Sequence, residues 1–186
     1  MKSAARTFEV TATRSGLAVG ELVVYAGHGV GRISVREKRG EPGARTEVVV
    51  LAFADGLSVT LPIERAREYL RPISGKAEVE RVQKTLRVTQ KPSGEPWQKR
   101  FRTTQAKVAV GEALGLAEVV GDGARRDNGP VDRGGPGRLS ASERDLYVKA
   151  RRLLATEIGI SRGTDTAEAD AWIAGQLAHN LGAVQA

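Results

Sequence analysis

The spacing of apolar residues changes once along this 186-residue chain, near residue 71, and that change restricts the folds open to it. Residues 19 to 71 place apolar side chains at alternate positions or in short runs, a pattern typical of β-strands. Strands are expected over 19–25, 30–35, 47–53 and 57–61. From Ala77 onward, apolar residues recur at every third or fourth position, which predicts helices. We therefore expect an α+β fold, a small β-barrel of roughly four or five strands followed by an all-α bundle of about five helices.

Two turns in the β region have distinct glycine patterns. Asp55 and Gly56 form the dipeptide of a two-residue hairpin, in which both central positions need positive φ. The segment 27–31 has glycine at alternate positions and superficially resembles a phosphate-binding loop. It leads into a strand instead of a helix N-terminus, so a tight β-turn is the better interpretation. His28 within it is expected to be structural or exposed.

The helical region has one clear start signal and one interruption. Ser140 and Glu143 have the spacing of a capping box, which predicts a helix from there to a stop at Gly159. Residues 121 to 138 hold six glycines and two prolines, too many for a helix interior. We expect a flexible loop over 121–138, after a short helix over 113–120.

The same signals predict the domain limits. Residues 1 to 16 show no clear periodicity and are expected to form an N-terminal extension. The β domain is expected over 17–73 and the helical domain over 77–184.

The composition excludes several kinds of site. The chain has no cysteine, which rules out disulfides, thiol catalysis and thiolate metal ligands. Its two histidines, His28 and His179, argue against an imidazole-rich metal centre. The longest apolar run, residues 48 to 54, is far shorter than the roughly 18 residues of a membrane span. We expect a cytoplasmic protein with no cofactor or metal, and no nucleophile, base or carboxylate pair predicts an enzyme.

Charge gives the first positive indication of function. The chain carries 29 Lys and Arg against 22 Asp and Glu, a formal net charge of +7. Residues 81 to 107 alone hold eight basic residues and one acid, Glu95. A basic cluster of this kind predicts an anionic partner, most commonly nucleic acid. The alternative is a solvated helix face with no partner.

Trp97 is the most distinctive residue of this segment, in a chain with 4% aromatic residues. It follows Pro96, which we expect to be the first residue of a helix. Three basic residues lie close to it: Lys99, Arg100 and Arg102. A flat apolar side chain flanked by cations suits insertion at a base step in a widened minor groove. The spacing leaves an alternative open, because Trp97 and Phe101 are four residues apart and both fit a helix face directed at the core.

Several segments, taken in order, resemble one known family. They are VGELVVYAGHGVGRI from Val19, DGLSVTLPIERA from Asp55, WQKRFR from Trp97, AEVVGDGARRD from Ala117, and GRLSASERDLYVKARRLLATE from Gly137. Together they resemble the CarD/CdnL family of bacterial transcription regulators, over about residues 19 to 177. The resemblance implies a Tudor-like N-terminal domain that binds the lobe of the RNA polymerase β subunit. It also implies a helical domain on promoter DNA at the upstream edge of the melted region.

The resemblance assigns roles to particular residues. It implies that Trp97 wedges into the minor groove while Lys99 and Arg102 contact phosphates, which prolongs the life of the open promoter complex. The predicted DNA-binding residues are Trp97, Lys99, Arg100, Arg102 and Lys107. In the family a helix continues where this chain has Gly121 and Gly123.

On the polymerase side, Arg39 matches a basic position of the family. A second basic position falls on Thr60, so the remaining contact is left to Arg36, Arg45 or Arg65. The predicted polymerase-binding residues are Arg36, Arg39, Arg45, Thr60 and Arg65. The protein is expected to act as a monomer.

Two alternatives to this function stay open. One is a polymerase- or protein-interaction module without functional DNA contact, which predicts no salt-dependent DNA binding. The other is a stand-alone, non-specific DNA-binding protein, which predicts a steep salt dependence and no need for polymerase.

Overall fold

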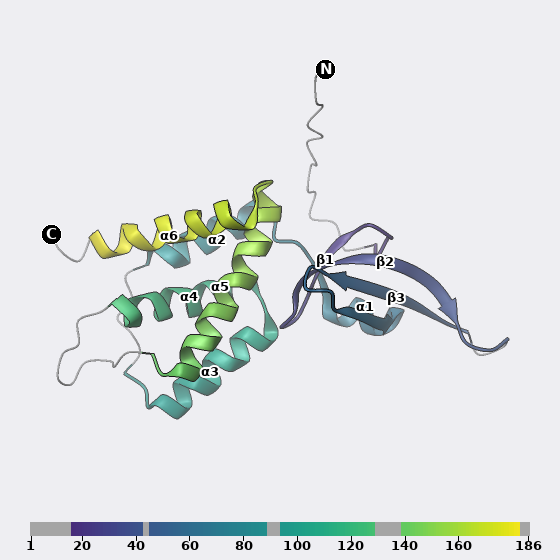
Figure 1. Cartoon of the computed structure of the whole chain (residues 1–186), viewed down its shortest axis with the longest axis horizontal. Helices are drawn as coiled ribbons and strands as arrows, with labels where there is room; N and C mark the ends of the chain where they lie inside the picture. The colour runs from purple at the N-terminus through teal and green to yellow at the C-terminus, as the bar shows by residue number, and fades with distance from the viewer. Residues whose placement is uncertain (1–15, 43–44, 89–93, 129–138, 183–186) are drawn as a thin grey trace, which may run out of the picture.

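The computed structural model describes residues 16–42, 45–88, 94–128 and 139–182. An antiparallel five-stranded sheet comes first in the chain, and the helices that follow pack together beside it (Figure 1). One cluster of buried apolar side chains lies under the sheet and another among the helices. The expected α+β class, with a small β domain before a helical bundle, is confirmed.

The sheet has the strand order β4-β3-β2-β1-β5, so β4 and β5 are its edges. The strands are β1 (Leu22–Tyr25), β2 (Gly29–Arg39), β3 (Thr46–Phe53), β4 (Ser58–Pro62) and β5 (Leu70–Pro72). The helices are α1 (Ile63–Tyr69), α2 (Lys76–Arg87), α3 (Trp97–Val110), α4 (Ala113–Asn128), α5 (Ala141–Arg162) and α6 (Thr166–Gly182). Residues 1–15 of the expected extension and residues 183–184 of the expected helical domain lie outside the described residues.

The sequence did not predict α1 or β5. Helix α1 has seven residues, too few to establish a period, yet it buries Ile63 and Ala66 against the core of the sheet. Strand β5 pairs with β1 at an edge, where Pro72 needs no N–H for a further strand. Both elements therefore depend on packing against the sheet instead of on their own sequence pattern.

The hairpin between β3 and β4 lies where it was predicted, but its turn type differs. The Phe53 N–H donates to the Leu57 carbonyl at 2.9 Å, which leaves three residues in the loop. Gly56 has a φ of 85°, whereas Asp55 does not have positive φ. The Asp55 carboxylate instead accepts a hydrogen bond from the Leu57 N–H at 3.1 Å. The loop is thus the three-residue form that ends in a left-handed glycine.

The glycine-rich segment 27–31 forms the expected tight turn between β1 and β2. Gly27 and Gly29 have φ of 71° and 90°, and the His28 N–H donates to the Tyr25 carbonyl at 3.0 Å. The exposed imidazole of His28 stacks on the Tyr25 ring with a centroid distance of 5.1 Å.

Helix α5 begins with the predicted capping box. The Glu143 N–H donates to Ser140 Oγ at 3.3 Å, and the Ser140 N–H donates to Glu143 Oε2 at 3.0 Å. The predicted stop at Gly159 is wrong, because α5 continues to Arg162 and ends at Gly163, whose φ is 69°. A Cβ on Gly159 would lie 3.0 Å from the Asp165 carbonyl oxygen. That glycine serves the close approach of the turn before α6, not the helix end.

The predicted loop over 121–138 is wrong in its first part, because α4 extends to Asn128. A Cβ on Gly123 would lie 2.4 Å from Cδ2 of Tyr147 on α5. The glycine thus allows α4 and α5 to pack closely, and this packing outweighs a local penalty of about 1 kcal/mol for glycine in a helix. Residues 129–138 lie outside the described residues.

Gly123 is needed for close helix packing, whereas a helical glycine with open space around it is not. Gly123→Ala should lower the free energy of unfolding by about 1–3 kcal/mol, because the new methyl group meets the Tyr147 ring. Gly175→Ala in α6 is the matched control, since nothing lies within 4 Å of its Cβ position. It should raise stability by about 0.5–1 kcal/mol through helix propensity alone. Urea unfolding monitored by circular dichroism measures both, and equal effects of the two variants would contradict the packing role.

Candidate nucleic-acid interface

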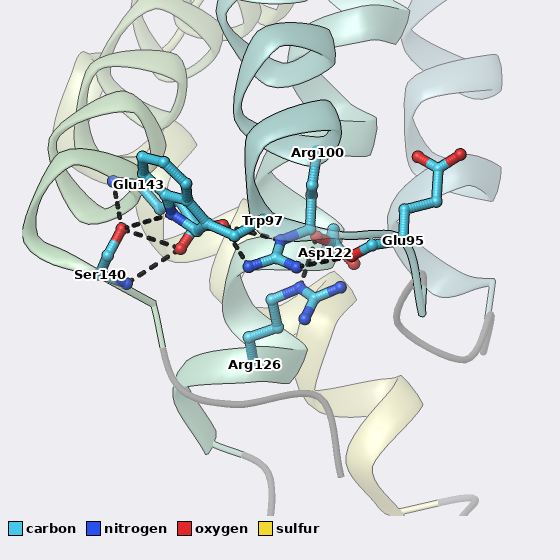
Figure 2. Close-up of polar contacts among 7 residues, drawn as sticks. All are labelled: Glu95, Trp97, Arg100, Asp122, Arg126, Ser140 and Glu143. Carbon is cyan, nitrogen blue, oxygen red and sulfur yellow. Dashed lines mark hydrogen bonds and ion pairs between the residues drawn. The ribbon is translucent and has the colours of Figure 1, made fainter. Parts of the chain in front are cut away.

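Trp97 is the first residue of α3 and lies at a corner of the helical bundle, beside the start of α5 (Figure 2). Its side chain is half exposed, with a relative accessibility of 46%. The indole Nε1–H donates to Ser140 Oγ at 3.2 Å, and the ring stacks on Phe101 with a centroid distance of 5.4 Å. Trp172, by contrast, packs against the helical core. Trp97 therefore presents a fixed aromatic surface to solvent.

The same corner of the bundle holds a largely buried ion pair between Arg100 and Glu143. The Arg100 Nε and Nη2 atoms both lie 2.7 Å from Glu143 Oε1, and Arg100 Nη1 donates to the Glu95 carbonyl at 3.1 Å (Figure 2). The exposed fractions of the two side chains are only 16% for Arg100 and 5% for Glu143. Glu143 also caps α5 through Ser140, the residue that holds the Trp97 indole. Tryptophan, cap and ion pair thus form one connected network.

Two effects act on the pKa of Glu143. Burial raises the pKa of this carboxyl group, whereas hydrogen bonds from Arg100 and Ser140 lower it. The hydrogen bonds dominate, so the pKa lies below its ordinary value of 4.5 and the carboxylate is charged near neutral pH.

The other predicted phosphate contacts divide between two sides of α3. Lys99 pairs with Glu95 at 2.6 Å and is still 69% exposed, and Arg102 is also exposed. These two positions are about 60° apart around the helix, so they share its outer side. Lys107 is about 140° from Arg102 and pairs with Glu118 of α4 at 2.7 Å. It lines a cleft of about 400 Å³ on the other side of α3.

The predicted polymerase-binding residues also divide, because neighbouring positions on a strand face opposite ways. Residues directly opposite one another on neighbouring strands share a face, and Thr60 lies opposite Val50, which lies opposite Val35. Arg39 has the same alternation, so it shares this outer face with Thr60. We call the face that carries Arg39, Val35, Val50 and Thr60 the outer sheet face.

Arg36, three residues before Arg39, faces the opposite side. It pairs with Glu47 at 2.7 Å and donates to the Gly16 carbonyl at 3.0 Å. Arg65 lies on α1, the helix that covers the core side of the sheet, and donates to the Tyr69 hydroxyl at 3.1 Å. Arg45 is exposed just before β3.

The sequence did not reveal that Ser140, Glu143 and Arg100 support Trp97. The capping box predicted the local role of Ser140 and Glu143, but which tryptophan lies over the cap depends on how α3 packs against α5. Arg100 was predicted as a DNA contact from its position in the basic cluster, and the structure leaves only 16% of its side chain exposed because it pairs with Glu143.

Across the four described ranges, no helix combines the length and the apolar content that crossing a bilayer demands. The same residues contain no cluster of three or more His, Cys, Asp or Glu arranged to hold a metal ion.

Two protein-family descriptions match the chain in the order of its two parts. The CarD-like/TRCF RID domain matches residues 17–74, and the CarD C-terminal domain matches residues 81–174. A sheet domain of the first type followed by helices of the second defines a class of transcription regulators that interact with RNA polymerase. The chain belongs to the CarD/CdnL family within that class.

The buried pair makes the stability of the bundle depend on pH. A folded-state pKa below the unfolded value of 4.5 means that Glu143 contributes stability above about pH 4.5, which is lost as the pH falls through the folded value. Glu143→Gln should lower the free energy of unfolding by about 2–4 kcal/mol at about pH 7, and by less in acid. Glu118→Gln is the control, because its pair with Lys107 is exposed and is expected to contribute at most about 1 kcal/mol. Urea unfolding across the acid range measures both, and a Glu143→Gln deficit that does not shrink in acid would contradict the assignment.

Proposed function

We propose that this protein stabilises the open promoter complex while it is bound to the β subunit of RNA polymerase. In this proposal Trp97 wedges into the minor groove at the upstream edge of the melted DNA. The observation that carries it is the half-exposed indole, held by Ser140 and Phe101 at the start of the helix that also carries the exposed cations Lys99 and Arg102. The family assignment favours a non-enzymatic transcription factor.

The arrangement around Trp97 suits a wedge energetically. Inserting a side chain at a base step requires unstacking that costs a few kcal/mol, which phosphate contacts and new stacking must offset. An indole that is already ordered loses little conformational entropy when it inserts. Lys99 can exchange Glu95 for a phosphate with little loss, because exposed ion pairs contribute at most about 1 kcal/mol.

Polymerase supplies the affinity that the DNA contact lacks. Sequence-neutral DNA binding is weak at physiological salt, with dissociation constants of about 10⁻⁴ to 10⁻⁶ M. Attachment to polymerase makes the DNA contact effectively intramolecular, so no base-reading helix is required. Arg100 is already paired with a buried carboxylate, which leaves fewer cations for DNA and favours polymerase-dependent DNA binding over a stand-alone DNA-binding protein.

The outer sheet face is our candidate for the polymerase contact. It combines the cation Arg39 with Val35, Val50 and Thr60, and β4 beside it is an unpaired edge of the sheet. Thr60 stands where the resemblance implies a second cation, so the contact rests more on Arg39. Arg36 and Arg65 point to the other side and are less suited to the same partner.

Trp97→Ala should shorten the lifetime of the open complex by roughly tenfold, since a base–aromatic stack is worth about 1–3 kcal/mol. The measurement uses a bacterial RNA polymerase on a promoter with a short-lived open state, challenged with heparin. Trp97→Phe, which keeps a flat ring but loses the hydrogen bond to Ser140, should give an intermediate lifetime. Gln98→Ala, next to the wedge and exposed, should change nothing. An unchanged lifetime with a folded Trp97→Ala variant would rule out the wedge.

Arg39→Glu should weaken binding to the isolated β lobe by about tenfold, because it reverses a charge at the proposed contact. Arg65→Glu makes the same charge change on the α1 side of the sheet and should leave the affinity unchanged. Titration calorimetry with the purified lobe measures both. If Arg65→Glu weakens binding and Arg39→Glu does not, the polymerase contact lies on the α1 side.

A further inference from the structure

One buried carboxylate on α5 joins the helices to the sheet domain. Glu157 has a relative accessibility of 1% and accepts four hydrogen bonds from residues 71–74. Arg71 of β5 donates from Nη1 to Oε1 at 2.6 Å and from Nη2 to Oε2 at 2.8 Å. Ser74, which follows β5, donates to Oε1 from its N–H at 3.1 Å and from its hydroxyl at 2.6 Å. This number of donors is what a buried carboxylate needs.

The same residues reach two further points of the bundle. Arg71 Nη2 also donates to the carbonyl of Gly111, the residue that ends α3, at 2.7 Å. The Ser161 hydroxyl donates to the Ser74 carbonyl at 2.6 Å. Arg71 is therefore bonded at once to the end of α3 and to the interior of α5.

Next to the Arg71–Glu157 pair, the glycine-rich turn between β1 and β2 lies close to the helices, partly with backbone against backbone. A Cβ on Gly111 would lie 3.0 Å from the Gly27 nitrogen, and a Cβ on Gly27 would lie 3.3 Å from the Ala109 carbonyl oxygen. A Cβ on Gly29 would lie 2.7 Å from Cδ2 of Leu153 on α5. A Cβ at Gly111 or Gly27 would therefore press against backbone atoms across the contact, and one at Gly29 would displace the end of the Leu153 side chain. We call this contact, together with the Arg71–Glu157 pair, the seam.

Helix α3 connects the seam to the Trp97 corner. It begins at Trp97 and ends at Val110, and its C-cap Gly111 lies against the turn between β1 and β2 (Figure 1). Its fourteen residues span about 21 Å, so a small rotation at the seam moves the indole by a larger distance. The position of Trp97 relative to the sheet is thus set at the far end of its own helix.

We propose that Glu157 and the glycines of the seam are positioning residues, which hold the sheet and the helices as one rigid body. The inference deepens the proposed function, because it requires Trp97 to act at a fixed distance from a polymerase contact on the sheet. A rigid connection raises the effective concentration of the wedge at its DNA site. A loosened seam lowers that concentration while each separate contact stays intact.

The first test measures how rigidly the seam holds the sheet against the helices, independently of the proposed function. The chain has no cysteine, so Ser58→Cys on β4 and Gln98→Cys on α3 allow specific nitroxide labelling of two exposed sites in the full-length protein. Pulsed electron spin resonance then gives the distribution of distances between the sheet and the helices. The otherwise wild-type protein should give one narrow distribution, and seam variants should broaden it.

Two seam variants have matched controls. Gly111→Ala and Gly163→Ala both place alanine at a helix end with a φ near 70°, but only at Gly111 does the new Cβ meet another backbone. Glu157→Gln puts an amide N–H₂ among the donors of Arg71 and Ser74, whereas Glu118→Gln alters an exposed pair. Broadening in both seam variants and in neither control supports the inference. Unchanged distributions in both seam variants overturn it.

The second test asks whether the seam positions the wedge. Gly111→Ala should keep the wild-type affinities for the isolated β lobe and for promoter DNA, and shorten the open-complex lifetime by about tenfold. A broadened distance distribution with an unchanged lifetime would refute the positioning role. If the wild-type protein itself fails to prolong the open complex, the proposed function fails, and the distance measurement still decides whether the seam is rigid.

Discussion

Two buried carboxylates on α5 organise the rest of the molecule. Glu143 and Glu157 lie fourteen residues apart, nearly four helical turns, so they occupy one face of α5 about 21 Å apart. Glu143 receives Arg100 near the start of α3, and Glu157 receives Arg71, which also bonds the carbonyl at the end of α3. Neither carboxylate is stable in a buried position without its arginine. The two pairs therefore fix α3 against α5 at both ends, and the second pair adds the sheet.

These internal ion pairs reduce the number of basic side chains that can contact an anionic partner. The formal charge of +7 predicts an anionic partner, yet Arg71 and Arg100 use their charge inside the protein. Among the predicted DNA-binding cations, only Lys99 and Arg102 are exposed, a smaller set than the sequence implied. Net charge predicts the kind of partner, but burial decides which cations are accessible to it.

The division into sheet and helices, the capping box and the place of the β3–β4 hairpin were predictable from the sequence because each is a local pattern. The two wrong helix limits both involve glycine. Gly123 and Gly159 were interpreted as breakers on local propensity, whereas the structure uses the absence of their Cβ for close contacts with Tyr147 and with the Asp165 carbonyl. A contact of this kind depends on a residue distant in sequence or beyond the next turn, so a local penalty of about 1 kcal/mol does not reveal it.

The candidate site shows the same limit. The basic residues around Trp97 in the sequence predicted an exposed side chain, which the structure has. Its hydrogen bond to Ser140 could not be predicted, because that bond depends on how α3 packs on α5. That attachment also has a suitable strength for the proposed wedge. A hydrogen bond between neutral groups contributes about 0.5–1.5 kcal/mol net, and a base stacked on an aromatic ring about 1–3 kcal/mol. The bond is strong enough to orient the indole, and in the proposal stacking on DNA is the larger contribution. Because Glu143 keeps Ser140 and Arg100 in place through its own bonds, the orientation of the indole depends in turn on the buried carboxylate of α5.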